Sequence, residues 1–474
     1  MNALNRSGFS AQQWRVLTVI LVSYLVILLD TSIVITGLPE IRQSLGFSVT
    51  GLSWVQNIYT LCFGGLLMLG ARLGDLLGRK RMYLLGLALF VLASLLIGAA
   101  QSPQWLLAAR ALQGIGAAIL APSTLALLSI NFSEGHERTR ALAYYAATAG
   151  IGATLGLVLG GLFAGWLSWR VGFFINVPIG IALLLTSRSL LVESERHRGA
   201  FDLPGAVLST VGTAALVYGI EHAATAGWQD SQTLIAAASG VALLVLFVLV
   251  ERRSAQPLLP LRLFNSRERV GAYLGRMLFL GAMVSFFFFT TQFMQNVLGM
   301  TPVQAGIGFI PFTVPTFFSS IMVPRLTRRL GNSGVLLLAL LLLAIGMYLL
   351  SHLTADAKYL SGLAWPMLLL GLGNGAALGP LTISGVAGVE ARDAGAASGL
   401  VNMAHQLGGT LGLSIMVVVF AAAHQSQLDG KVLLAHQLSA GFAGCLVALL
   451  LAALVTLLCN LLPTQNKPTL AAAR

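Results

Sequence analysis

Charged residues are scarce in this chain of 474 residues: Asp, Glu, Lys and Arg together make up 9% of it, against 57% hydrophobic residues. Soluble domains carry about 25% charged residues. So few charges cannot cover the surface of a folded chain of this length in water, which argues against a soluble globular protein. The 52 glycines favour closely packed apolar helices over a disordered chain.

Cysteines are equally few. Cys62, Cys445 and Cys459 all lie inside apolar runs, which indicates small buried residues rather than a disulfide framework. The pattern G-x-x-x-x-G-K-[ST], which cradles nucleotide phosphates, does not occur, and neither a metal-ligand cluster nor a nucleophile–base spacing is visible in the sequence. We therefore expect no enzyme activity and no cofactor. Any activity that requires energy has to be driven by a gradient and not by nucleotide hydrolysis.

Long apolar runs, by contrast, are abundant. A helix needs about 20 apolar residues to cross a bilayer. The first run is too long for the apolar region of a cleaved signal, about 7–15 residues, and is expected to stay as a span. We predict an all-α integral membrane protein with fourteen spans, near residues 15–36, 51–72, 82–100, 105–130, 141–165, 171–191, 203–222, 232–250, 270–292, 303–323, 334–353, 361–388, 395–421 and 437–461.

The net charge of +12 would suggest nucleic acid binding in a soluble protein. With the N-terminus in the cytoplasm, however, 22 of the 28 basic residues fall in cytoplasmic loops and tails, and two, Arg110 and Arg276, fall inside spans. The outer loops hold only Arg42, Arg170, Lys358 and Lys431. This bias predicts a multi-pass protein of the cytoplasmic membrane with both termini in the cytoplasm, in contact with lipid and not with nucleic acid.

A weak internal repeat divides the chain. Arg72-Leu73-Gly74 after the second span resembles Arg325-Leu326-Thr327 after the tenth, and Gly114-Ile115-Gly116 in the fourth resembles Gly373-Asn374-Gly375 in the twelfth. Two similar six-helix units facing one another across a cavity are a transporter architecture. The predicted parts are an N-terminal half at 1–200, two linking helices at 201–255 and a C-terminal half at 256–474.

The loop after the second span reads GARLGDLLGRKR from Gly70 to Arg81. Its glycines permit a tight turn between helices, and the full spacing of glycines, acid and basic pair closely resembles the signature loop of the major facilitator superfamily. In that family the loop latches the two halves together on the cytoplasmic side. The resemblance assigns this gating role to Gly70, Gly74, Asp75, Gly78, Arg79 and Lys80.

Other segments are similar to the fourteen-helix drug:proton antiporters of that superfamily, which are multidrug and quaternary-ammonium efflux pumps. They include Leu29-Asp30-Thr31, Arg110-Ala111-Leu112-Gln113-Gly114 and Phe174-Ile175-Asn176. The antiporter motif of the fifth span departs from the pattern, because Leu157 stands where proline is expected. Its glycines remain and form a ridge that another helix can approach closely: Gly152, Gly156, Gly160 and Gly161.

Ionisable side chains inside spans are candidates for function, since each is costly unless it faces protein or water. Asp30 is expected to exchange a proton and to attract a cationic substrate. The resemblance ties Arg110 to proton transfer. Glu221 is a second proton site or a solvated carboxylate at the outer end of its span. For Arg276 we expect a side chain that reaches back toward the cytoplasmic surface.

Aromatic and amide side chains predict the substrate cavity. Aromatic faces with scattered amides suit bulky lipophilic cations, through stacking and cation–π contact. The candidates are Trp54, Asn57, Tyr59, Gln292, Gln295, His405 and Gln406.

Together these features predict a proton-coupled antiporter that works as a monomer by alternating access and exports lipophilic cations, using the proton gradient. Three alternatives remain open: a narrow exporter of one metabolite or antibiotic, a substrate:proton symporter, and a membrane scaffold without transport.

Overall fold

The computed structural model describes residues 9–48, 50–132, 136–193, 202–254, 257, 259–390 and 393–461. This described part is helical throughout and contains no strand. The first seven helices are α1 (Ala11–Leu45), α2 (Ser53–Leu77), α3 (Arg79–Gly98), α4 (Pro103–Asn131), α5 (His136–Trp166), α6 (Trp169–Phe174) and α7 (Asn176–Leu190). A pair follows, α8 (Leu203–Ala226) and α9 (Ser231–Arg253).

The rest of the chain combines α-helices with short 3-10 and π-helical turns. They are η1 (Leu261–Asn265), α10 (Arg267–Gln292), η2 (Phe293–Val297), α11 (Pro302–Ile307), α12 (Ile310–Leu350), η3 (Tyr359–Ala364), α13 (Trp365–Gly385), α14 (Ala394–Ala422), α15 (Gly430–Thr456) and η5 (Leu457–Leu461).

Local sequence explains several helix ends. At the start of α1 the Ser10 side chain accepts a hydrogen bond from the backbone N–H of Gln13, and the Gln13 side chain accepts one from the backbone N–H of Ser10. The helix ends at Gly46, which adopts the left-handed region with φ 75°. At the start of α9 the carboxylate of Asp230 accepts from the N–H groups of Thr233 and Gln232. These backbone donors, that of Thr233 first, lower the pKa of Asp230.

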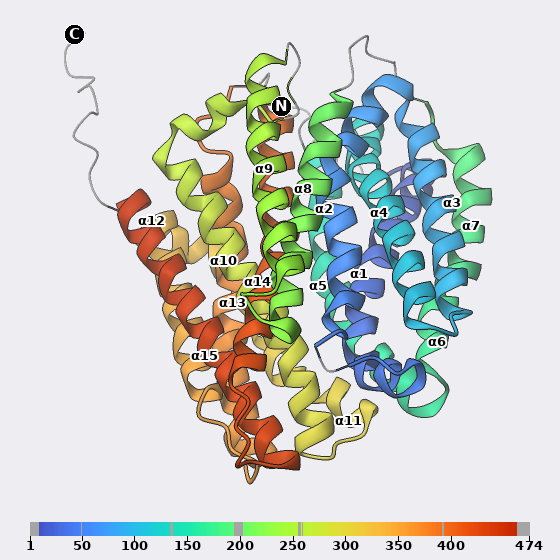
Figure 1. The fold of residues 1–474 in the computed structure, drawn as a ribbon. Coiled ribbons are helices and arrows are strands. Elements are labelled where there is room, and N and C mark those ends of the chain that lie inside the picture. The colour runs from blue at the N-terminus through green and yellow to red at the C-terminus, as the bar shows by residue number, and fades with distance from the viewer. Residues whose placement is uncertain are drawn as a thin grey trace, which may run out of the picture.

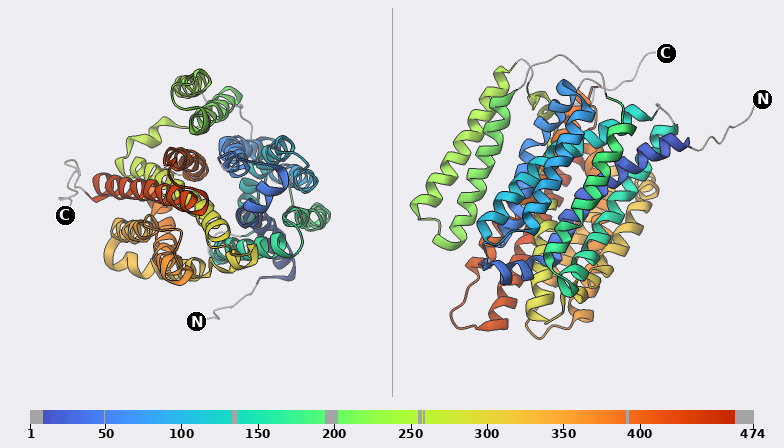
Figure 2. Two further views of the ribbon diagram at one scale, coloured as in Figure 1. Left: turned by 60° about the horizontal axis from the view of Figure 1, so that its bottom comes forward. Right: turned by 90° about the vertical axis from the view of Figure 1, so that its right-hand side faces the viewer.

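The helices form two bundles. Helices α1–α7, blue to teal in Figure 1, lie together on one side, and α10–α15, yellow to red, lie on the other. Helices α8 and α9 pack against each other at the periphery, which the left view of Figure 2 shows end on. Both ends of the described chain lie at the same end of the molecule. The predicted part boundaries at 200/201 and 255/256 fall outside the described residues and stay predictions.

The described residues contain 12 helical segments long and apolar enough to cross a membrane. A multi-pass membrane protein is thus what the structure supports, but with fewer spans than the fourteen predicted. One difference lies in Pro302–Leu350, a single segment of 49 residues that contains the predicted spans 303–323 and 334–353. Helical geometry breaks inside it at Gly331, with φ 72° and ψ 167°, a conformation that glycine adopts because it has no Cβ.

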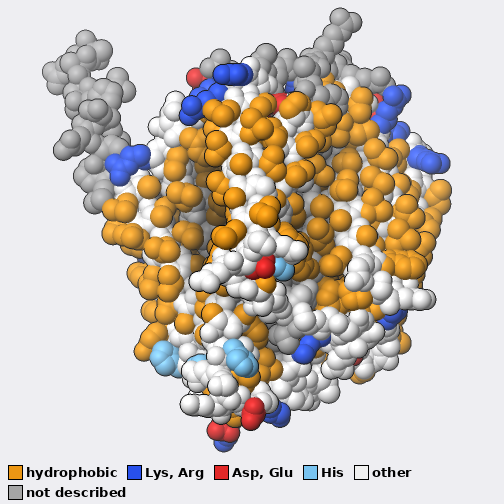
Figure 3. All heavy atoms as spheres, viewed as in Figure 1, with side chains coloured by type: hydrophobic (Ala, Val, Ile, Leu, Met, Phe, Trp, Pro, Cys, Tyr) orange, Lys and Arg blue, Asp and Glu red, His pale blue; other side chains and the backbone are white. Residues whose placement is uncertain are grey.

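The other difference lies in α5, which contains the predicted span 141–165. Several of its side chains are outside the described set. The part of α5 that is identified as an apolar helix, Leu155–Trp166, is too short to cross a membrane. Figure 3 agrees with a membrane location, since hydrophobic side chains form a broad band and charged ones lie mainly toward the two ends of the molecule.

The two bundles share a core at the end opposite the termini. Val34, Leu38 and Ile41 of α1 belong to one buried cluster with Phe286 and Phe293 of the other bundle. Toward the end that carries the termini, a second cluster contains only residues between 9 and 191 and stays within the first bundle.

Candidate functional site

Asp30 and Arg110 form a buried ion pair inside the first bundle. Arg110 Nη1 lies 2.7 Å from Asp30 Oδ2, and both side chains are 0% exposed. Asp30 comes from α1 and Arg110 from α4, so the pair joins two helices. Sequence reasoning proposed each residue separately but not their contact.

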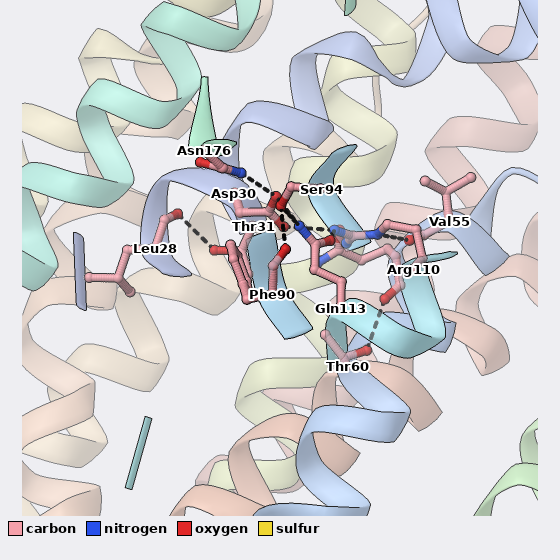
Figure 4. Close-up of polar contacts among 11 residues, drawn as sticks. Leu28, Asp30, Thr31, Val55, Thr60, Phe90, Ser94, Arg110, Gln113 and Asn176 are labelled. Carbon is pink, nitrogen blue, oxygen red and sulfur yellow. Dashed lines mark hydrogen bonds and ion pairs between the residues drawn. The ribbon is translucent and has the colours of Figure 1, made fainter. Parts of the chain in front are cut away.

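Two amides complete the surroundings of Asp30 (Figure 4). Gln113 Nε2 donates to Asp30 Oδ1 at 2.7 Å and to Ser94 Oγ at 2.9 Å, and Asn176 Nδ2 donates to the same Oδ1 at 3.1 Å. Arg110 Nη1 also donates to Gln113 Oε1 at 2.7 Å. Gln113 and Asn176 were not predicted as site residues. The spacing of Gln113, three residues after Arg110 on the same helix face, is the signal that identifies it.

The guanidinium of Arg110 is held on its other side by α2. Its Nε donates to the carbonyl of Val55 at 3.0 Å, and its Cζ lies 4.3 Å from the ring centroid of Tyr59, a cation–π contact. Tyr59 is 0% exposed. Tyr59 thus packs against this arginine, and its place in the substrate cavity stays a prediction.

Glu221 links α8 to both bundles. Its Oε1 accepts from Ser53 Oγ at 3.0 Å, from Asn57 Nδ2 at 2.5 Å and from Ser414 Oγ at 3.0 Å, while its Oε2 is buried without a hydrogen bond. The side chain is 6% exposed, so it is not a solvated carboxylate. Asn57, which is predicted to line the substrate cavity, is buried and donates to Glu221.

The loop between α2 and α3 is tied to its own bundle by the contacts in the described residues. Asp75 and Arg79 form an ion pair one helical turn apart. Glu193 accepts from the backbone N–H of Lys80 at 2.9 Å, and Lys80 Nζ donates to the carbonyl of Arg188 at 2.8 Å. Gly78 has φ 106°, which turns α2 into α3, and a Cβ on Gly70 would lie 2.8 Å from the carbonyl carbon of Ala118. The latch role stays a prediction.

The glycine ridge of α5 does receive a second helix. A Cβ on Gly152 would lie 3.0 Å from Leu28 Cβ, and one on Gly156 would lie 3.1 Å from the carbonyl of Leu29. Gly160 faces Ile33 in the same way, so α5 packs directly on α1. Gly161 instead faces the other bundle, where a Cβ would lie 2.5 Å from the carbonyl of Pro302.

The seven predicted cavity residues contact different neighbours. Trp54 contacts the ring of Tyr218, with 6.4 Å between ring centroids. Gln292 is buried and accepts from Asn296, and Gln295 Nε2 donates to the carbonyl of Thr36 at 2.9 Å, which bridges the bundles. Gln406 packs against Gly64. Each of these residues has its own contact in this structure, and the substrate cavity stays a prediction.

Arg276 of α10 forms a second polar cluster, in the other bundle. Its Nη1 donates to Thr382 Oγ1 of α13 at 2.9 Å, and its Nη2 donates to His405 Nδ1 of α14 at 3.2 Å. Its Nε is buried without a hydrogen-bond partner. The side chain is 7% exposed, so the prediction that it reaches to the surface is wrong: its donors are held by the two neighbouring helices.

Solved structures of transporters have the same fold as this chain. A peptide transporter crystallised with sulfate superposes with a TM-score of 0.69 at 14% identity, covering 96% of this chain and 95% of that one. A bacterial homologue of the human lysosomal transporter Spinster, in an inward-facing and unoccupied conformation, gives 0.64 at 16% identity, covering 95% and 96%.

Among sequence relatives, a cephamycin export protein of Amycolatopsis lactamdurans is 40% identical over 84% of this chain and 83% of its own length. A puromycin resistance protein of Streptomyces alboniger is 39% identical over 89% of this chain and 84% of its own. The profile of the Major Facilitator Superfamily matches residues 20–413. The chain therefore belongs to the major facilitator superfamily.

Proposed function

We propose that this protein is a proton-coupled exporter of lipophilic organic compounds. The observation that carries the proposal is the buried Asp30–Arg110 pair, a carboxylate that can change charge at the junction of α1, α4 and α7. Buried ionisable groups inside membrane spans commonly serve ion and proton pathways. Relatives named for antibiotic export and resistance support the direction of transport.

In this proposal the structure corresponds to the state in which Asp30 is ionised. A proton on Asp30 removes the negative charge that opposes Arg110 and leaves that cation unpaired in a dry site. The helices then favour another arrangement, in which Arg110 meets water or substrate. Proton entry from outside and release inside would thus drive alternation between the two faces.

Glu221 is the proposed second titrating group. A proton on this carboxylate changes which of its oxygen atoms accept the hydrogen bonds from Ser53, Asn57 and Ser414. Because Ser53 and Asn57 belong to α2 and Ser414 to α14, that change acts on the contact between the two bundles.

For the membrane arrangement we propose fourteen crossings, with Pro302–Leu350 crossing twice around the break at Gly331 and α5 crossing once. About 20 residues suffice for one crossing. The shared end that carries both termini would then face the cytoplasm, as the distribution of basic residues favours. We propose a monomer in the cytoplasmic membrane as the working unit.

The substrate class is proposed as lipophilic compounds in general, including the lipophilic cations predicted from sequence. Both predicted carboxylates already have partners: Asp30 is ion-paired with Arg110, and Glu221 accepts hydrogen bonds from three donors. A cationic substrate would therefore have to displace those partners. A narrow exporter of one antibiotic is the second candidate, because the relatives are named for single compounds. A symporter is the third.

The test uses proteoliposomes that contain the purified full chain and an imposed pH gradient. Export of a lipophilic fluorescent dye should follow the gradient in wild type and vanish in Asp30→Asn, which keeps the shape of the side chain but not its charge. Asp230→Asn, which alters a half-buried carboxylate at the start of α9 and keeps an oxygen to cap that helix, is the matched control and should transport like wild type. Gradient-driven export by Asp30→Asn at the wild-type rate would refute the proposal.

A further inference from the structure

The Arg276 cluster contains a buried cation that has no carboxylate beside it in the part of the chain that the structure describes. Its hydrogen bonds go to Thr382 and His405, and no ion pair is found for it among the described residues. Arg110, equally buried, has a carboxylate at 2.7 Å. A charge buried without an opposite charge costs free energy. The cluster therefore lacks a negative group that would complete it.

The free donors of the cluster are defined by its hydrogen bonds. A guanidinium can only donate, so His405 Nδ1 accepts from Arg276, and the proton of the neutral ring lies on Nε2. Thr382 accepts from Arg276 and donates to the carbonyl of Leu378 at 2.8 Å. Arg276 Nε remains without a partner. Donors without acceptors, on a fixed cation, suit an oxyanion.

Close helix packing holds these donors in place. A Cβ on Gly408 of α14 would lie 2.7 Å from the carbonyl oxygen of Met277, and one on Gly281 would lie 2.9 Å from the Cα of Gly412. Helices α10 and α14 thus meet backbone to backbone, and the first of these contacts lies within one turn of the Arg276–His405 contact. A donor on such a rigid crossing is preorganised, so a ligand does not have to order it.

The surroundings of the cluster are apolar, and one of its members is exposed. Tyr273, Val401 and Ala404 belong to a buried hydrophobic cluster on the neighbouring turns of α10 and α14. Thr382, which contacts the guanidinium directly, is exposed. A ligand that reaches Thr382 meets a positive charge in an apolar environment.

We propose that Arg276 and His405 form a subsite for the carboxylate group of an amphipathic substrate. The proposal deepens the proposed function and rests on it, because it names a class of compound that the exporter carries. The guanidinium supplies the charge and a directed N–H donor, His405 supplies a second donor, and the apolar neighbours accept the body of the compound. An anionic lipid headgroup offers related chemistry, and the experiment separates the two sources.

The experiment measures binding of dansyl-leucine and of its methyl ester, which has the same body without the charge. The full chain is studied in nanodiscs of phosphatidylcholine without a proton gradient, so that a failure of proton coupling does not affect the result. Wild type should bind the carboxylate about tenfold more tightly than the ester, as expected for one charged hydrogen-bonded contact.

Arg276→Gln should abolish this preference and leave the affinity for the ester unchanged. Arg276→Lys keeps the charge and should keep a reduced preference, which also serves if Arg276→Gln does not fold. Arg253→Gln removes an exposed arginine and is the control for net charge; it should behave like wild type. Equal binding of acid and ester by wild type, or an undiminished preference in both Arg276 variants, would overturn the subsite.

A parallel series with phosphatidylglycerol in the nanodiscs identifies the occupant. For a substrate site, addition of this lipid should change the affinity for dansyl-leucine by the same factor in wild type and in Arg276→Gln, which has no cation to bind a headgroup. Displacement of the probe by the lipid in wild type alone would assign the site to a headgroup phosphate and refute the assignment to substrate.

Discussion

Each bundle contains a buried arginine, and the two arginines have different partners. Arg110 meets a carboxylate, an amide, a backbone carbonyl and an aromatic ring, whereas Arg276 meets one hydroxyl and one imidazole. Both are at least nine-tenths buried. Each guanidinium keeps one buried nitrogen without a hydrogen bond among the described residues, Nη2 of Arg110 and Nε of Arg276, so the difference lies in the carboxylate. In our proposal one bundle carries an internal charge pair that a proton can break, and the other keeps a cation available for a ligand.

The largest difference between the two bundles is expected when each arginine is removed and the stability of the two variants is compared. Arg110→Gln leaves Asp30 buried without its counter-charge and should destabilise the protein by about 3–5 kcal/mol. Arg276→Gln leaves no charge unpaired and should change stability little. Thermal unfolding in detergent at one pH compares them. Equal destabilisation by the two variants would remove the distinction between the bundles.

A double variant tests whether the loss in Arg110→Gln comes from the unpaired carboxylate. Asp30→Asn combined with Arg110→Gln removes both charges, so it should recover about 2 kcal/mol or more of the stability lost in Arg110→Gln alone. Export should remain absent, because no group is left at this position to carry the proton. The contrary outcome is a double variant no more stable than Arg110→Gln.

Gln113 provides a smaller effect within the same bundle. Gln113→Leu removes the donor to Asp30 and the acceptor for Arg110, and should cost about 1–3 kcal/mol, since it leaves buried polar atoms unsatisfied. Unfolding measurements on Gln113→Leu and on Gln113→Glu would show whether the amide donor or only the volume matters. A neutral effect of Gln113→Leu would mean that Arg110 and Asp30 need no third partner.

The smallest effect is expected at Thr382. Thr382→Val keeps the shape of the side chain but removes the oxygen that accepts from Arg276, at a cost of about 0.5–1.5 kcal/mol. The carboxylate preference of the dansyl probes should then change by a few-fold at most, because Arg276 and His405 remain. Complete loss of binding would show that Thr382, and not the arginine, anchors the ligand.

The sequence predicted the membrane class, the family and the two residues of the central pair, because an ionisable side chain stands out in an apolar run. It did not predict that Asp30 and Arg110 touch, since helix–helix register is set by packing between distant segments. Gln113 and Asn176 lie in segments that resemble the family, but the sequence alone does not show that they contact Asp30, since that contact depends on how α1, α4 and α7 pack.

Helix geometry decides which neighbours the predicted cavity residues contact. Residues three apart on a helix share a face, so Trp54 and Asn57 both point from α2 toward α8, whereas Tyr59 points to another side. The structure places them against Tyr218, Glu221 and Arg110, respectively. Arg276 was misjudged because its distance from the helix end allows the side chain to reach the surface, and only the positions of Thr382 and His405 reveal that it does not.

Proton release on substrate binding tests the central claim most directly. In weakly buffered detergent, a pH indicator records protons released when a transported compound is added to the purified protein. If substrate and proton compete through Asp30, wild type should release protons in a saturable way and Asp30→Asn should release none while still binding the compound. Equal proton release by Asp30→Asn and wild type would contradict the account.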